Sequence, residues 1–178
     1  MDLAPIVNQT LGILTILAQA FILLLVISLL TKKPFLLVNF ISKKGFLLAF
    51  VVALVSTLGS LTYSDIIGYE PCKLCWLQRI LMYPQVIILG MVLFKKDYRI
   101  ADYPIVLSII GAVLAGYHYL LQIGVAPALP CSTVRYSAPC SQRFVLQYGY
   151  ITIPMMAVSA FILIALLLYS RQLYSKPP

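Results

Sequence analysis

Two cysteines stand at the head of a long apolar run in the segment YEPCKLCWLQRILMYPQVIILGMVLF, residues 69–94. The Cys-x-x-Cys spacing of Cys72 and Cys75 is that of a redox-active pair or of two metal ligands. Glu70 and Pro71, directly before them, are typical of a helix N-terminus, with Pro71 in the first turn. Because free N–H groups and the helix dipole stabilise an anion there, we expect both thiols to have a lowered pKa and to react as thiolates.

An arginine lies deeper in the same run. Cys72, Cys75 and Arg79 occupy positions i, i+3 and i+7, which predicts a single helical face with Arg79 on the order of 10 Å below Cys72. A guanidinium near the centre of a membrane span costs about 2.5–3.5 kcal/mol, so such residues usually mark a function. We therefore expect a redox pair with a cation beneath it.

The single histidine, His118, lies in another apolar run, GAVLAGYHYLLQIG. A lone histidine is more often a packing residue than a catalytic one. Here, however, Gly111, Ala115 and Gln122 share its helical face, and small residues on a face allow close helix approach. We expect this face to point into a helix bundle, with His118 at a depth similar to that of Arg79. A second small-residue stripe is interpreted as plain helix packing, and its members are Ala49, Ala53, Ser56 and Ser60.

The composition is that of an integral membrane protein. Of the 178 residues, 62% are hydrophobic and 10% are charged, and the mean hydropathy is +0.99. Such a chain is far too apolar for an ordinary soluble domain. The sequence predicts an all-α polytopic membrane protein, because several stretches can cross a hydrocarbon core of about 30 Å as helices. The predicted spans are 11–30, 45–63, 74–94, 104–123 and 150–169.

The net charge of +8 lies mainly in alternate turns rather than on one face. Lysines and arginines cluster after the first, third and fifth spans, and the positive-inside rule places these connections in the cytoplasm. The N-terminus and both cysteine-bearing segments are then extracytoplasmic, and the C-terminus is cytoplasmic. The charge therefore indicates topology, and nucleic-acid binding is excluded. The apolar segment 34–43 is too short to span and is predicted to lie along the inner interface.

All four cysteines, Cys72, Cys75, Cys131 and Cys140, fall in the two segments assigned to the outside. An oxidising compartment outside the cytoplasm is where disulfides persist. Haem attachment is excluded because Trp76 stands where a histidine must follow the second cysteine. A zinc or copper site built from the four thiolates stays open, although the Cys-x8-Cys spacing of the second pair is unlike that of usual ligand pairs. Two static structural disulfides also stay open, but they leave the arginine unexplained.

Four motifs resemble, in their order, those of the bacterial DsbB family of disulfide-forming membrane thiol oxidases, including its Gram-positive-type, BdbC-like members. The motifs are PCKLCWLQR, GYHYLLQ, a Pro-rich loop with a cysteine pair, and YGYITIPMMAVSAF. The resemblance covers residues 45–169. It implies a four-helix transmembrane bundle, the thiol oxidase core, over residues 45–178. Residues 1–44 then form one extra N-terminal transmembrane helix and a cytoplasmic interfacial segment. The extra helix is expected to be a packing partner, an assembly contact or a helix that closes a quinone slot.

The resemblance also implies an electron path in the bacterial cytoplasmic membrane. A DsbA-like partner with a thioredoxin fold is reoxidised, and the electrons pass to a membrane quinone, ubiquinone or menaquinone. Cys131 is expected to react with the partner, Cys140 to relay to Cys72, and Cys75 to face the quinone. Because only eight residues separate Cys131 from Cys140, no long helix is expected in that loop. The residues expected to bind the quinone are Gln78, Arg79, His118 and Gln122.

Overall fold

The computed structural model describes residues 3–31, 36–96, 100, 102–126 and 139–175. Within these residues, five helices are long and apolar enough to cross a membrane. A single π-helical turn, η1, follows the second of them. The fold class predicted from the sequence, an all-α polytopic membrane protein, is therefore confirmed. The elements are α1 (Leu3–Thr31), α2 (Leu36–Leu61), η1 (Thr62–Ile66), α3 (Lys73–Lys95), α4 (Asp102–Gln122) and α5 (Ile153–Ser175).

The predicted spans match these helices, with differences of three or more residues at the starts of α1, α2 and α5. Helix α5 begins at Ile153 rather than at residue 150, because a turn at residues 147–151 precedes it. Helix α1 begins at Leu3 rather than at residue 11, because Pro5 lies in its first turn, where a proline is tolerated. The segment predicted to lie along the interface is helical from Leu36 onward and continuous with α2. No helix-breaking residue separates it from Lys43 and Lys44, so the helix runs through. Residues 34 and 35 lie outside the described residues, and the position of this segment relative to a membrane stays a prediction.

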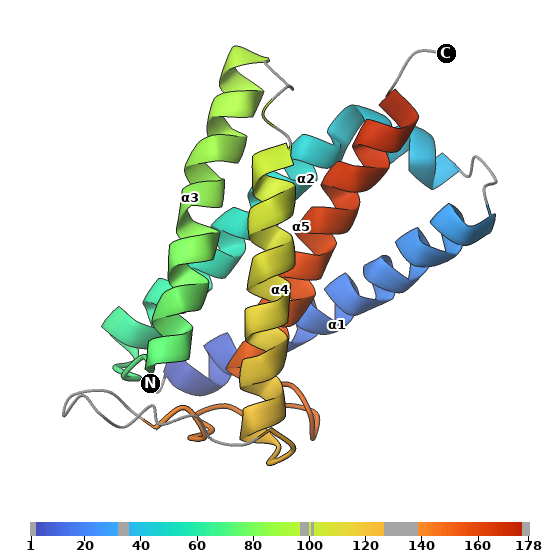
Figure 1. Cartoon of the computed structure of the whole chain (residues 1–178). Helices are drawn as coiled ribbons and strands as arrows, with labels where there is room; N and C mark the ends of the chain where they lie inside the picture. The colour runs from blue at the N-terminus through green and yellow to red at the C-terminus, as the bar shows by residue number, and fades with distance from the viewer. Residues whose placement is uncertain (1–2, 32–35, 97–99, 101, 127–138, 176–178) are drawn as a thin grey trace.

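Helix α5 is the centre of the bundle, as Figure 1 shows. It packs mainly against α2 and α4, and α1 lies diagonally along its outer side. Half of the residues in the most apolar part of α5 are buried, a larger share than in any other span among the described residues. Its fully buried side chains, at 0–1% exposure, are Phe161, Ile164, Leu167 and Leu168. Helix α5 therefore sets the relative positions of the other helices.

The close approach of α4 to α5 depends on Gly111. A Cβ atom at Gly111 would lie 2.4 Å from Cε1 of Phe161, closer than real side chains approach. The face of α4 that carries Gly111, Ala115, His118 and Gln122 is buried, as the spacing predicted. The small side chain therefore lets the Phe161 ring lie against the backbone of α4, and this contact holds α4 beside α5.

The N-terminal part of α1 and the segment before α5 lie at one end of the bundle, which we call the cysteine end (Figure 1). Cys72, Leu74, Leu121 and Cys140 form a small buried cluster there. A tight turn at residues 147–151 precedes α5, with Tyr148 and Gly149 at positive φ. The ring of Tyr148 lies against Gly12 of α1, where a Cβ atom would be 3.2 Å from its Cε2. This turn thus attaches α1 to the cysteine end.

Adding one methyl group at Gly111 should loosen the bundle. Gly111→Ala forces the buried Phe161 ring to move, and we expect a loss of about 1–3 kcal/mol in the free energy of unfolding. Gly116→Ala on the same helix is the matched control, because no atom lies within 4 Å of its added Cβ. The control should gain up to about 1 kcal/mol from helix propensity. Thermal unfolding in detergent measures both, and equal melting temperatures for the two variants would contradict this account of the α4–α5 contact.

Candidate functional site

Cys72 and Cys75 meet at the start of α3. Cys72 is the N-cap residue, with φ −72° and ψ 172°, and its sulfur accepts a hydrogen bond of 3.4 Å from the Cys75 N–H. The thiol of Cys72 donates to the sulfur of Cys75 at 3.3 Å. The start of α3 thus holds the two free thiols in contact, in a position from which oxidation can join them in a disulfide.

The extended backbone of Cys72 changes two expectations. Because an N-cap residue lies outside the helix, Cys72 does not share the face of Cys75 and Arg79, and its side chain contacts His118 of α4 instead. Pro71 precedes the N-cap and is therefore not in the first turn. The prediction of a single face for positions 72, 75 and 79 holds only for Cys75 and Arg79.

The thiol of Cys72 is less acidic than the sequence predicted. The hydrogen bond that it donates to Cys75 retains its proton, and burial adds to this, so the pKa of Cys72 is raised to about 12. The expectation of a lowered pKa at this residue is wrong, because the helix terminus acts on a group that is 4% exposed and already donates its proton. The same hydrogen bond stabilises negative charge on Cys75.

His118 connects Cys72 with the segment before α5. Its Nδ1 lies 2.9 Å from Gln78 Nε2, which can only donate, and its Nε2 lies 3.0 Å from the carbonyl oxygen of Cys140, which can only accept. These partners assign a neutral ring with the proton on Nε2. The same Nε2 lies 3.7 Å from the sulfur of Cys72. The proton on Nε2 is therefore placed between the two cysteine-bearing segments.

Gln122 and Arg143 fix the position of Cys140. Gln122 Nε2 donates to the carbonyl oxygen of Gln142 at 2.9 Å. The guanidinium of Arg143 donates through Nε, at 2.8 Å, and through Nη2 to the carbonyl oxygen of Gln122, at the last turn of α4. A cation is favourable at a helix C-terminus. Cys140, 3% exposed, is thus held against α4 through Gln142 and Arg143, which follow it closely in the chain.

Arg79 is held by neutral groups of α2. Its Nε donates to Ser60 Oγ and its Nη2 to the Ser60 carbonyl oxygen, both at 3.0 Å. Tyr83 also donates to Ser60 Oγ, at 3.3 Å, and the guanidinium lies 5.2 Å from the ring centroid of Trp76. Among the described residues, no carboxylate pairs with Arg79. Its charge is therefore oriented but not neutralised.

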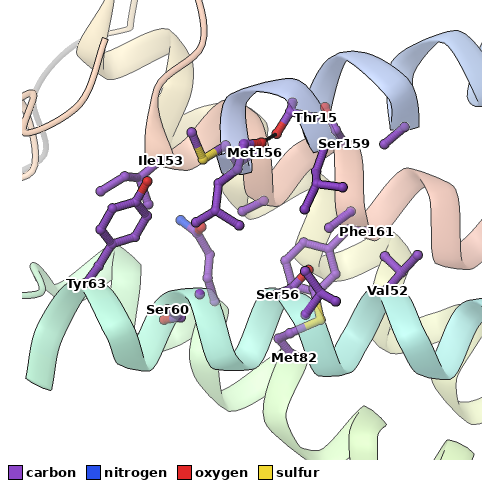
Figure 2. Close-up of a pocket in the computed structure, with 18 of the residues that line it drawn as sticks. Thr15, Val52, Ser56, Ser60, Tyr63, Met82, Ile153, Met156, Ser159 and Phe161 are labelled. Atoms are coloured by element: carbon purple, nitrogen blue, oxygen red, sulfur yellow. Dashed lines mark hydrogen bonds between the residues drawn. The ribbon is translucent and has the colours of Figure 1, made fainter. Parts of the chain in front are cut away.

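A cavity of about 410 Å³ lies on the Arg79 side of α3. Its walls come from α1, α2, α3 and α5, and Figure 2 shows side chains of these helices directed into it. Most of the lining is apolar, and volumes of about 300–1,000 Å³ with a few polar groups are typical of small-molecule sites. Cys75, Gln78 and Arg79 line it on α3, while Glu70 and Phe144 lie at its cysteine end.

The structure separates the four residues expected to bind one ligand. Gln78 and Arg79 line the large cavity. His118 and Gln122 do not: they line a pocket of about 20 Å³ on the other side of the cysteine pair, with Cys72 and Pro139. Similar depth does not specify which neighbouring helix a side chain faces: Arg79 contacts α2, whereas His118 lies on α4, and α3 packs against both. Cys75 lines both spaces.

Several residues of the site were missed by the sequence interpretation. Ser60, interpreted as plain packing, is the hydrogen-bond partner of Arg79. Tyr63, Tyr69 and Phe144 form a stack with ring centroids 5.8 and 4.9 Å apart, and all three line the cavity. The sequence offered one signal for Ser60. It lies on a small-residue stripe, near the same membrane face as Arg79. Nothing in the local sequence marks the three rings.

Two of the expectations for the second cysteine pair fall on residues 127–138, which lie outside the described residues. They concern the role of Cys131 and the absence of a long helix from its loop. The role of Cys131 and its pairing with Cys140 therefore stay predictions.

Soft metal ligands also meet at the site. One ligand atom each from Cys72, Cys75 and His118 lies within 4.8 Å of the others. Structural zinc sites use four such ligands, and within the described part of the chain no fourth cysteine, histidine or carboxylate joins this group. The arrangement can hold a metal ion only with a ligand from elsewhere.

Comparison with known proteins shows the family to which the chain belongs. The profile of the family "Disulfide bond formation protein DsbB" matches residues 42–171. The chain belongs to the DsbB family. The resemblance inferred from four motifs is therefore confirmed, and the protein is a membrane protein of disulfide bond formation. Helix α1 lies outside the matched range.

Several relatives carry names of the same activity. Disulfide bond formation protein C of Bacillus subtilis (strain 168) is 47% identical over 118 residues, which cover 65% of this chain and 83% of that protein. The SPbeta prophage-derived disulfide bond formation protein B of the same organism is 41% identical, with 68% of this chain and 81% of that protein covered. A probable disulfide formation protein of Metapseudomonas resinovorans is 40% identical, with 68% and 85% covered. No solved structure matches the chain significantly.

Proposed function

We propose that this protein is a thiol:quinone oxidoreductase that reoxidises a DsbA-like partner and transfers the electrons to a membrane quinone. Each step moves two electrons and two protons. The partner dithiol becomes a disulfide as the Cys131–Cys140 disulfide becomes a dithiol, which the Cys72–Cys75 disulfide then reoxidises. The Cys72–Cys75 dithiol is reoxidised in turn as the quinone is reduced to quinol.

One observation carries this proposal: Cys75 lies between two different spaces. On one side is the large apolar cavity with Arg79, and on the other are Cys72, His118 and the backbone of Cys140. An electron path between a protein disulfide and a lipid-soluble acceptor needs such a boundary. The pair therefore has an exchange side, with Cys72 and His118, and an acceptor side, with Cys75 and Arg79.

The acceptor side fits a quinone. A quinone needs an apolar slot with a few convergent polar groups, and the cavity supplies Arg79 on mostly apolar walls. Gln78 also lines the cavity, with its amide nitrogen bonded to His118. The guanidinium stabilises negative charge that develops on a bound oxygen or on Cys75, since no carboxylate among the described residues pairs with it. Helix α3 places Cys75 one turn from Arg79, at i and i+4. These residues position and stabilise, while the quinone supplies the electron-accepting chemistry.

The exchange side gives His118 a role different from quinone binding. When the Cys140 thiolate attacks the sulfur of Cys72, the bond to Cys75 breaks and Cys75 takes the negative charge. When Cys131 then attacks Cys140 in the mixed disulfide, Cys72 leaves as the thiolate, and the Nε2–H of His118, 3.7 Å from its sulfur, can donate to that charge. Gln78, bonded to Nδ1, keeps the proton on Nε2. We assign His118, Gln78 and Gln122 to this side, with Gln78 also forming the wall between the two sides.

A metal-binding protein is the second candidate, favoured by the three soft ligands at the pair. It does not account for the cavity or for the unneutralised Arg79. The family of the chain also favours redox chemistry at these cysteines.

Removing the charge of Arg79 should impair the acceptor side alone. For Arg79→Ala we expect the quinone KM to rise, or quinone reduction to slow, by about 10–100-fold, because a hydrogen bond to a charged group contributes about 1.5–3 kcal/mol. Exchange between the reduced partner and the oxidised protein should keep its rate. Arg79→Lys should restore only part of the activity, since the planar fork is lost.

Arg171→Ala is the control for loss of an arginine from a helix, because Arg171 lies at the other end of the bundle, over the Phe46 ring. Stopped-flow mixing measures the exchange, and quinone absorbance measures the second half-reaction. Unchanged quinone kinetics with a lowered melting temperature for Arg79→Ala would make Arg79 a structural residue.

A further inference from the structure

Tyr63 carries a buried hydroxyl group without a hydrogen-bond partner. The side chain is 5% exposed, and among the described residues it is the cavity-lining side chain whose buried polar atom is unpaired. Figure 2 shows its ring rising from the ribbon of α2 and η1 toward Ile153 on the opposite wall. A buried hydroxyl without a partner is costly, so its presence needs an explanation.

Several other hydroxyl and amide groups on the cavity wall already have partners. Ser60 accepts from Arg79, and Gln78 is bonded to His118. Ser159 Oγ accepts from Gln19 and donates to the Met155 carbonyl oxygen. Thr15 likewise donates within its own helix. The hydroxyl of Tyr63 is thus left available to a group inside the cavity.

The backbone and the neighbouring rings fix Tyr63 in this position. Tyr63 lies in η1, and Ile67 N–H donates to the Thr62 carbonyl oxygen at 3.0 Å to close its wide turn. Such π turns are rare and occur frequently at functional sites. The stack of Tyr63 on Tyr69, and of Tyr69 on Phe144, limits rotation of the ring. The donor is therefore pre-organised.

We propose that the hydroxyl of Tyr63 donates a hydrogen bond to an oxygen of the quinone, as a polar contact additional to Arg79. This rests on the proposed quinone function. A quinone has two carbonyl oxygens that accept hydrogen bonds, and the cavity offers an oriented cation, Arg79, and a buried hydroxyl without a partner, that of Tyr63. Tyr63 is a binding residue that orients the ring beside Cys75.

Tyr63→Phe tests this, since it removes only the hydroxyl. We expect the dissociation constant for a short-chain quinone to rise about tenfold. The melting temperature of the quinone-free protein should stay the same or rise, because no hydrogen bond is lost. Tyr83→Phe is the matched control, because it removes a hydroxyl that donates to Ser60 and should lower the melting temperature. Quenching of the fluorescence of Trp76, the single tryptophan, measures quinone binding without turnover.

The outcomes separate this inference from the function on which it rests. Unchanged quinone affinity in Tyr63→Phe, with binding intact in the unsubstituted protein, would overturn the role of Tyr63 and indicate that water alone meets its hydroxyl. No quinone binding by the unsubstituted protein would overturn the proposed function itself.

A second observation concerns α1, which lies outside the family range and still forms a wall of the cavity. Thr15, Ala18 and Phe21 of α1 face the cavity lining of α2 and α5. Gln19 of α1 donates to Ser159 of α5 at 3.1 Å and accepts from Tyr150 at 2.7 Å. On the α2 side, Leu11 lies against Gly59. Helix α1 is therefore attached on both sides of the space that it covers.

We infer that α1 closes the lipid-facing side of the quinone cavity, so that quinone binding in this chain depends on a helix outside the family core. Of the three roles expected for the extra helix, its position on the cavity wall favours closure, and its contacts with α5 also make it a packing partner. The outer face of α1 carries exposed apolar side chains such as Ile13, Leu23 and Leu24, as a wall in contact with lipid requires. This inference also rests on the proposed function.

Ala18 and Ala20 offer a matched test, because Ala18 lines the cavity and Ala20 is exposed two residues later. Ala18→Phe fills part of the cavity and should raise the quinone dissociation constant at least about tenfold, with a smaller rise for Ala18→Leu. Ala20→Phe should leave it unchanged, and exchange with the partner should be unaffected in all three. Trp76 quenching and the quinone retained on purification measure binding. Equal affinities of the Ala18 and Ala20 variants, with quinone binding intact, would overturn closure by α1.

Discussion

A guanidinium without a carboxylate, inside an apolar helix bundle, is the constraint on which the site depends. Arg79 is oriented by the hydroxyl and the carbonyl oxygen of Ser60 on α2, and among the described residues no negative charge meets it. Such a group is costly at membrane depth and persists where its charge is used. Because α2 holds the arginine from one side, the cavity forms between α2 and α5, and the sulfur of Cys75 opens into it.

The start of α3 gives the two cysteines different environments. Cys72, as the N-cap, turns away from the helical face and contacts His118, and its thiol keeps its proton. Cys75 lies within the helix, accepts the hydrogen bond of Cys72 and borders the cavity. The position of the helix boundary thus gives Cys72 and Cys75 different neighbours, and the proposed exchange and acceptor sides rest on this difference. A Cys-x-x-Cys pair placed in the middle of a helix has no such asymmetry.

The sequence predicted the helices well, because long apolar runs bounded by charged turns leave few alternatives in a membrane. It also predicted the buried face of α4, since Gly111 and Ala115 mark close helix contact. It failed where contacts between distant helices decide. Ser60 has no local feature that identifies it as the partner of Arg79. His118 and Gln122 were grouped with Arg79 because residue spacing predicts the face of a helix on which a side chain lies and its depth in the membrane. Spacing does not predict which neighbouring helix that face contacts. The N-cap geometry of Cys72 likewise depends on one ψ angle, which the motif does not specify.

The central claim is that electrons pass from a protein dithiol through this chain to a quinone. The most direct measurement is anaerobic mixing of the purified, oxidised protein with a reduced thioredoxin-fold partner and a soluble quinone, while quinone absorbance is followed. The account predicts one quinone reduced for each partner dithiol oxidised, and loss of this turnover when any one of Cys72, Cys75, Cys131 or Cys140 is replaced by serine. Absence of quinone reduction, together with a metal ion released from the protein by acid, would contradict it.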